Sequence, residues 1–191
     1  SAVSISAIAQ DQDGTLIAGG FFLDVGGVPM LNIARWNGTA WVPIGDGLIG
    51  RVRDLHTLPD GGLVAGGKFS NTTSNLATWD GTAWSYDLQV TGMNGIFSLT
   101  VLDDGDLVVG GDFTTAGSQP VHSIARLDSE TLAWSSLGTG IDGTVDTLAA
   151  LPGGGFAAGG RFTSADSQVN AYFAVFGCDT PTCPSDFDGD G

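Results

Sequence analysis

The stretch DGDLVVGGDF at residues 104–113 contains a glycine turn, a short apolar run, a Gly pair and, one residue further on, a Phe. The Gly pair with its Phe recurs four times, in segments 19–22, 66–69, 110–113 and 159–162, at intervals of 44 to 49 residues. A glycine also lies five residues before each pair, at Gly14, Gly61, Gly105 and Gly154. Repetition at a fixed period of this size indicates a tandem-repeat fold.

Each repeat predicts four short strands. An apolar run such as residues 52–58 is followed by a glycine turn and then by a second apolar strand that ends in the Gly pair. After a polar loop, a third strand is predicted at 33–36, 76–79, 124–127 and 173–176, and a fourth at Trp41, Trp84 and Trp134. Four short strands at this period are typical of a β-propeller blade.

We therefore predict an all-β fold, a β-propeller of four blades that are each a four-stranded antiparallel sheet. The blades are expected at about residues 3–47, 48–91, 92–140 and 141–177, with an extended tail at 178–191. Blades stack through aromatic and apolar side chains, so we expect the repeated aromatic residues to pack between blades. These are Phe22, Phe69, Phe113, Phe162, Trp36, Trp41, Trp79, Trp84 and Trp134. A sugar-stacking platform is the functional alternative for the Trp residues, but it does not explain why they recur in register.

The pattern resembles two known repeat families. The order of apolar run, Gly pair, aromatic residue and later Trp is similar to the kelch repeat, with residues 127–134 closest to the kelch turn. The combination of Asp-Gly, Gly-Gly-x-Phe and Ile-Ala-Arg, seen at 156–162 and 124–127, resembles the bacterial delta-sixty propeller repeat. The resemblance covers nearly all of residues 3–177 and implies architecture, because propellers host enzymes, lectins and scaffolds alike.

The fourth repeat is incomplete. After residues 173–176 the chain continues into Cys178, Pro181 and Pro184, which do not suit a strand interior. We expect a closed ring of four blades with a three-stranded last blade and the tail across its open edge. The alternative is that a strand of a neighbouring subunit fills the gap, and head-to-tail repetition of that contact would build a filament.

Composition narrows the range of partners. The chain has 21 acidic and 6 basic residues and a formal net charge of −15, which argues against nucleic acid or an anionic membrane surface as partner. No apolar run is long enough to span a membrane.

The last fourteen residues carry two further motifs. Cys178 and Cys183 are close enough to form a local disulfide, which predicts an oxidising, extracellular or cell-surface location. Asp186, Asp188 and Asp190 match positions 1, 3 and 5 of an EF-hand-type calcium loop, and resemble the first loop of bacterial dockerin-like modules. The sequence stops at position 6 of this loop, so we expect only weak Ca²⁺ binding here and a native chain that continues. No other cofactor is predicted.

The sequence contains no recognisable catalytic constellation. His56 and His122 lie in different parts of the repeat, and most Asp residues occupy repeated turns. The first interpretation is therefore a non-catalytic, secreted or surface-attached interaction module with a protein partner or self-association through the open edge or tail. A carbohydrate-binding propeller is the alternative, and a glycan-active enzyme ranks third. The patterns at Asn37 and Asn71 fit N-glycosylation.

Overall fold

The computed structural model describes residues 3–70, 72–169 and 171–177, and every regular element in these ranges is a β-strand. The predicted sites at Asn71, Cys178, Cys183, Asp186, Asp188 and Asp190 lie outside the described residues. The chain divides into two compact units, residues 1–90 and residues 91–191, which are described separately below.

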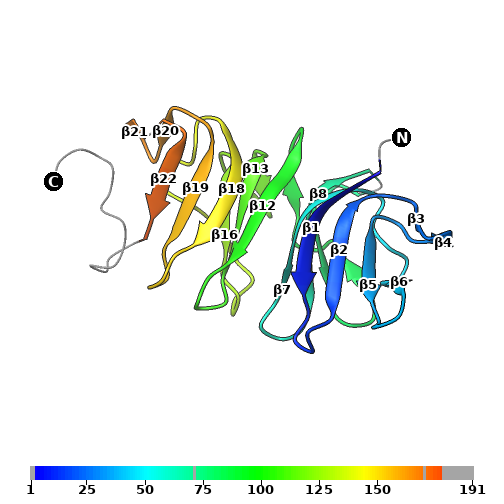
Figure 1. Cartoon of the computed structure of the whole chain (residues 1–191). Coiled ribbons are helices and arrows are strands. Elements are labelled where there is room, and N and C mark those ends of the chain that lie inside the picture. The colour runs from blue at the N-terminus through cyan, green and yellow to red at the C-terminus, as the bar shows by residue number, and fades with distance from the viewer. Residues whose placement is uncertain (1–2, 71, 170, 178–191) are drawn as a thin grey trace. The chain divides into compact units, whose positions relative to one another are not determined.

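Unit 1 contains two four-stranded antiparallel sheets (Figure 1). The first sheet has the order β1 (Ser4–Gln10), β2 (Leu16–Phe21), β5 (Ile33–Trp36) and β6 (Trp41–Pro43). The second sheet is formed by β7 (Gly50–Thr57), β8 (Leu63–Phe69), β9 (Leu76–Trp79) and β10 (Trp84–Ser85). A small hairpin of β3 (Asp24–Val25) and β4 (Val28–Pro29) follows the first Gly pair, and β11 (Val90–Thr91) lies at the unit boundary.

Unit 2 contains the third and fourth sheets. The third is β12 (Gly95–Val101), β13 (Leu107–Asp112), β16 (Ile124–Leu127) and β17 (Trp134–Ser136). The fourth has three strands in its described part, β18 (Thr144–Ala150), β19 (Phe156–Arg161) and β22 (Phe173–Phe176). Small hairpins lie beside them, made of β14 (Thr115–Ala116) with β15 (Gln119–Pro120) and β20 (Ser164–Ala165) with β21 (Gln168–Val169). The predicted all-β propeller fold is confirmed, and the four third strands have the predicted bounds.

The first two strands of each sheet are joined by a tight five-residue loop that needs a glycine. In the first sheet the Asp11 amide donates to the Thr15 carbonyl (2.8 Å), and the Gly14 amide donates to the Asp11 carbonyl (2.9 Å). Gly14 has φ +85°, and the equivalent glycines of the other sheets have φ of 88° or 89°. A residue with a side chain is strained in this conformation, which explains the repeated glycine.

The second strand does not end at the Gly pair as predicted but continues through it. All four first hairpins have a register shift opposite the pair, which leaves one extra residue on the first strand: Ser6, Arg53, Phe97 or Asp146. At this bulge the opposing backbone comes so close that a Cβ on Gly67 would lie 2.0 Å from the Arg51 carbonyl oxygen. The second glycine of the pair is therefore required by close backbone approach, not by a positive φ.

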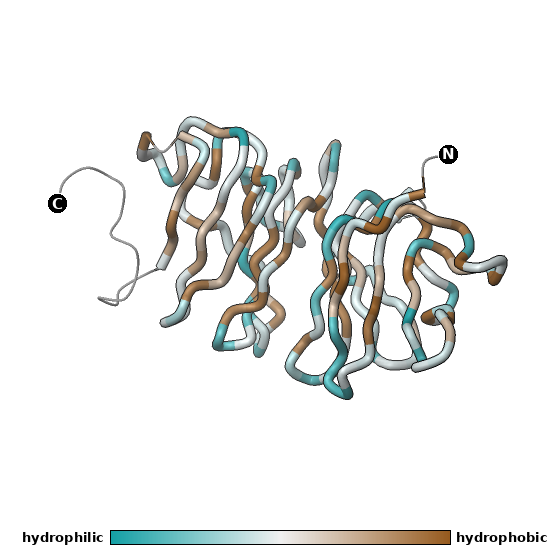
Figure 2. Tube along the Cα trace, viewed as in Figure 1, coloured by the Kyte–Doolittle hydropathy of each residue, from teal (hydrophilic) through white to brown (hydrophobic). Residues whose placement is uncertain are grey.

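Within each unit, apolar side chains pack the two sheets against each other. We call the face of a sheet that packs on the preceding sheet its front face, and the opposite face its back face. In unit 1, Val52 and Leu55 on the front of the second sheet share a core cluster with Ile17 and Ile33 on the back of the first. In unit 2, the front of the fourth sheet packs on the back of the third in the same way. Figure 2 shows the hydrophobic residues along the strands and hydrophilic residues in many of the connecting loops.

The polar loops after the Gly pairs share more structure than their sequences predict. In the first, third and fourth repeats, these loops form the small hairpins β3–β4, β14–β15 and β20–β21. The turns of the first and last contain two residues with positive φ, Gly26 and Gly27 in one and Asp166 and Ser167 in the other. The second repeat has no such hairpin in its described residues, because only six residues separate Phe69 from β9, against ten between Phe162 and β22.

Candidate binding groove in the first unit

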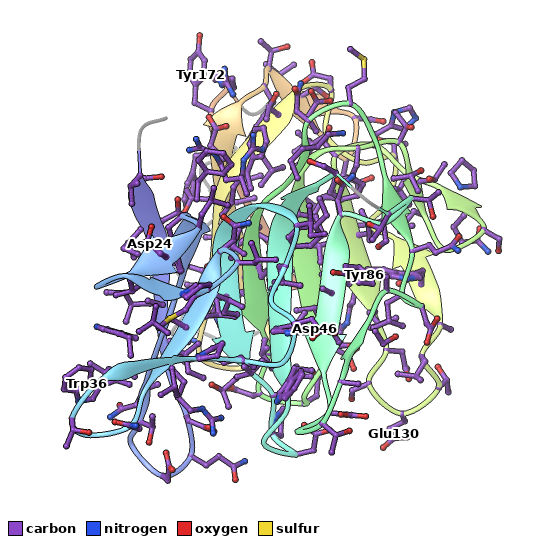
Figure 3. The ribbon with its side chains drawn as sticks, turned by 90° about the vertical axis from the view of Figure 1, so that its right-hand side faces the viewer. Asp24, Trp36, Asp46, Tyr86, Glu130 and Tyr172 are labelled. Atoms are coloured by element: carbon purple, nitrogen blue, oxygen red, sulfur yellow. The ribbon has the colours of Figure 1, made fainter. Side chains whose placement is uncertain are left out.

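A groove of about 470 Å³ lies in unit 1 where the turn after the first sheet meets the outer strands of the second. Its lining is aromatic on one side and a glycine-rich turn on the other. The residues are Gly45, Asp46, Gly47, Ile49, Trp79, Thr82, Ala83, Trp84 and Tyr86. Figure 3 labels Asp46 and Tyr86, which come from these two sides.

The aromatic side is held in place by contacts with the first sheet. Trp79 and Trp84 face each other across β9 and β10 with ring centroids 5.4 Å apart, and the Trp84 Nε1 donates to the Ile44 carbonyl at 3.1 Å. Tyr86 packs edge-on against buried Phe69 at 6.0 Å. Gly45 has φ +56°, and a Cβ there would lie 2.6 Å from the Trp79 ring, so the turn approaches the ring only because it lacks a side chain.

The groove is open because the second repeat lacks the small hairpin. In unit 2 the turn Gly138–Gly140 occupies the place that Gly45–Gly47 has in unit 1, and the β20–β21 turn covers it. The Asp166 carboxylate accepts from the Thr139 amide at 3.0 Å, and the Asp166 amide donates to the Gly140 carbonyl at 2.9 Å. In unit 1 no such hairpin covers the turn in the described residues, and the groove lies beside it.

The groove is acidic and contains one unused carboxylate. Asp46 is exposed and forms no hydrogen bond or ion pair with any residue in the described ranges. No Lys, Arg or His lines the groove. Burial raises the pKa of Tyr86, so its phenol is neutral at physiological pH. The groove thus presents three kinds of group to a ligand: aromatic ring faces, a neutral hydroxyl and an unpaired carboxylate.

A second, polar pocket of about 240 Å³ lies in unit 2 and contains His122, Asp142, Ser164 and Ser167. These residue types suggest a site with a nucleophilic serine, but the Asp142 carboxylate already accepts hydrogen bonds from the neighbouring loop. Its carboxylate accepts from the Thr163 hydroxyl (2.7 Å), the Thr163 amide (2.8 Å) and the Ser164 amide (2.9 Å), which holds the pKa of Asp142 below its usual value. Asp142 therefore orients backbone and not an imidazole, and this pocket lacks the base–carboxylate contact of a triad.

Sequence comparison assigns the family. The family model of the Rax2 C-terminal beta propeller domain matches residues 85–185, more than half of the chain. The chain belongs to this family. No curated protein shows significant sequence similarity to it.

Comparison with solved structures gives one match to this Rax2-family chain with a TM-score above 0.5. The extracellular domain of BT4673 from B. thetaiotaomicron has a TM-score of 0.53 and 12% identity, over 90% of this chain and 21% of that one. YCF48 bound to D1 peptide gives a TM-score of 0.48 and 15% identity, over 86% and 50% of the two chains. A catalytically inactive virginiamycin B lyase from Staphylococcus aureus with quinupristin gives 0.49 and 12%, over 94% and 57%. The chain therefore spans between a fifth and just over half of the length of these structures.

The repeated Phe residues of the Rax2-family chain are all buried. Phe69 lies in the cluster shared by the first two sheets, and Phe162 lies in the cluster shared by the last two. Phe22 contacts Met30 and Ala34 within its own repeat, and Phe113 is 1% exposed.

The Trp residues lie nearer the surface than the Phe residues, and all five are half-buried. Trp36 and Trp41 pair with each other in the first sheet at 5.7 Å, whereas Trp84 reaches the neighbouring sheet through its bond to Ile44. Trp134 lies against Gly117 of its own repeat. Trp79 and Trp84, which the sequence predicts to pack between blades, lie beside the core cluster of unit 1 and also line the groove.

Asn37 lies in an exposed turn whose hydrogen bonds explain its sequon. Its Oδ1 accepts from the Thr39 amide, the Thr39 hydroxyl and the Ala40 amide at 2.9–3.0 Å. Asp80 accepts the same three bonds from Thr82 and Ala83 in the second sheet. The Asn-Gly-Thr pattern is therefore one version of a repeated turn. Among the described residues there is no group of metal-ligating side chains and no helix long and apolar enough to cross a membrane.

Proposed function

We propose that this Rax2-family propeller is a non-catalytic interaction module that binds a Lys- or Arg-bearing segment of a partner protein in the groove of unit 1. The observation that carries the proposal is the unpaired Asp46 carboxylate opposite the rings of Trp79 and Trp84. Cationic side chains are attracted to Trp faces and to a nearby carboxylate, and the groove itself supplies no cation.

The charge of the whole chain supports a basic partner. With a formal net charge of −15, the protein attracts basic segments at long range and repels acidic ones. We further propose, from the predicted Cys178–Cys183 pair, that the module works outside the cell or on the cell surface, and that it self-associates. Thiol titration without reductant tests the first of these: two free thiols would contradict it.

Peptide binding tests the groove. Quenching of Trp fluorescence by a hexa-arginine peptide, with hexa-glutamate as the charge-reversed probe, gives the affinity at low ionic strength. Asp46→Asn is expected to weaken hexa-arginine binding by about two- to fivefold, the range of an exposed ion pair.

Asp24→Asn is the matched control, because Asp24 is an exposed carboxylate of the same unit outside the groove, and Figure 3 labels both residues. Equal losses in the two variants would mean that binding depends only on net charge. In that case the groove is not the site.

Carbohydrate binding is the second candidate, favoured by the two half-buried Trp rings beside Asp46 and Thr82. A repeat lectin is expected to repeat its site in every blade. The described part of the fourth repeat instead has Phe176 in place of Trp79, and the β20–β21 hairpin covers the equivalent turn. A glycan array separates the candidates: sugar binding that Asp46→Asn abolishes, without hexa-arginine binding, would favour the lectin.

A further inference from the structure

The front face of the first sheet is an apolar surface without a covering sheet in unit 1. Ile5, Ile8 and Leu16 on β1 and β2 are 52%, 68% and 43% exposed. No charged residue interrupts β1, which reads SISAIAQ. Apolar strand faces of this kind mark interaction surfaces in folded proteins.

The repeats show what covers such a face. The residues equivalent to Ile5, Ile8 and Leu16 are Val52, Leu55 and Leu63 in the second sheet, with exposed fractions of 0%, 3% and 0%. In the fourth sheet they are Val145, Leu148 and Phe156, with exposed fractions of 0%, 8% and 2%. In both cases the cover is the back face of a preceding sheet in the same unit.

The described residues also include an exposed back face. Ile33 of the first sheet and Ile124 of the third, which pack under the following sheet, are fully buried. Their equivalent in the fourth sheet is Phe173 on β22, which pairs with Gly159 as Ile33 pairs with Gly19, and it is 47% exposed. The first glycine of a pair normally receives the next sheet: a Cβ on Gly110 would lie 2.5 Å from Val145, whereas one on Gly159 meets only Thr147 and Tyr172.

We propose that the front face of the first sheet docks the back face of the fourth sheet of a second copy of this chain. The two surfaces are equivalent to the two sides of the sheet–sheet contact within each unit, a front face and the back face that covers it. Because the halves differ, the contact is heterologous, with Ile8 of one copy against the region of Phe173 of the other. This interface is separate from the groove and does not depend on what the groove binds.

Sedimentation velocity of the intact chain over a wide concentration range tests the proposal. The unmodified chain is expected to associate as concentration rises. Ile8→Asp and Phe173→Asp should each weaken association at least about tenfold, because each places a charge in an apolar contact. Leu132→Asp, at a site that is 60% exposed and on neither face, should leave association unchanged.

Circular dichroism establishes that each variant keeps its sheet structure. An unmodified chain that stays monomeric at every concentration would overturn the proposal. That outcome includes closure of the faces within one chain. Association that survives Ile8→Asp would also overturn it, since the contact would then use another surface, such as the edge of β22.

Discussion

The two glycines of each pair face different neighbours, and in the fourth sheet only the second glycine is closely approached by backbone. A Cβ on Gly160 would lie 2.1 Å from the Thr144 carbonyl oxygen, which belongs to the backbone of a bulge and has no room to shift. A Cβ on Gly159 would meet only the Thr147 methyl group closely, at 3.1 Å, with the Tyr172 carbonyl oxygen at an ordinary 3.8 Å. The hairpin backbone itself therefore requires a glycine only at the second position of the pair.

Replacing these glycines one at a time should give unequal losses of stability. Gly160→Ala is expected to lower the free energy of unfolding by about 1–3 kcal/mol or more, as overpacking does, because the β18–β19 pairing must open. Gly159→Ala should cost less than about 1 kcal/mol, since one methyl group shifts by tenths of an ångström. Urea unfolding followed by circular dichroism measures both, and equal losses would mean that the bulge tolerates a side chain.

Among the elements, the turn between the third and fourth strands shows how one side-chain oxygen supports a hairpin. Asp80 accepts the Ala83 amide, the Thr82 hydroxyl and the Thr82 amide on a single oxygen, and these bonds hold the pKa of Asp80 below its usual value of 3.8. Asn37 accepts the same set on its Oδ1 in the first sheet. The turn thus accepts either an Asp or an Asn side chain, and only the Asp version titrates.

Acidification should therefore lower the stability of the parent more than that of a variant with Asn in place of Asp80. A carboxylate with a lowered folded pKa contributes stability above its unfolded pKa, here 3.8, and loses it as the pH falls through the folded value. Asp80→Asn is expected to match the parent at neutral pH and to lose less stability than the parent below about pH 4. Urea midpoints measured at a series of pH values test this. An acid loss in the variant equal to or steeper than that of the parent would contradict this link between the Asp80 carboxylate and stability.

The elements that the sequence predicted best are those with a long, repeated signal. The third strands were placed to the residue, since Ile-Ala-Arg-Trp and its relatives alternate in register between a Gly pair and a turn. The sequence did not predict the two-residue strands of the small hairpins, because their turns are Gly-Gly, Gly-Ser and Asp-Ser and share no motif. The bulges were not predicted either, because the extra residues Ser6, Arg53, Phe97 and Asp146 share no residue type.

The groove could be predicted only in part. Its Trp residues were visible as packing positions, but a concave site depends on what does not cover it. Here the open side results from a loop in the second repeat that is four residues shorter than its counterpart in the fourth. The difference in loop length was visible in the sequence. It indicates an open groove only once the hairpin of the other repeats and its contacts with Thr139 and Gly140 are known.

At the scale of the whole molecule, the two exposed sheet faces decide how copies of this chain can associate. In the described residues, the first sheet has an exposed front face at Ile5 and Ile8, and the fourth sheet has an exposed back face at Phe173. Two copies that satisfied both pairs of faces would contribute eight sheets, the upper end of the usual range of four to eight blades. A contact that does not close would extend into a filament. Light scattering separates a finite mass from continued growth.

The asymmetry of the contact leads to a sharper expectation for mixed variants. Ile8→Asp blocks only the front face, and Phe173→Asp blocks only the back face, so each variant alone has no intact pairing. In a mixture, the free back face of the first variant meets the free front face of the second, and one unmodified interface forms. Mixing two monomeric variants should therefore restore a heterodimer that is weaker than the unmodified assembly, detected by sedimentation with one variant labelled. If the contact paired like faces instead, as an isologous dimer does, each heterodimer would retain a charged face in every contact and mixing would restore nothing.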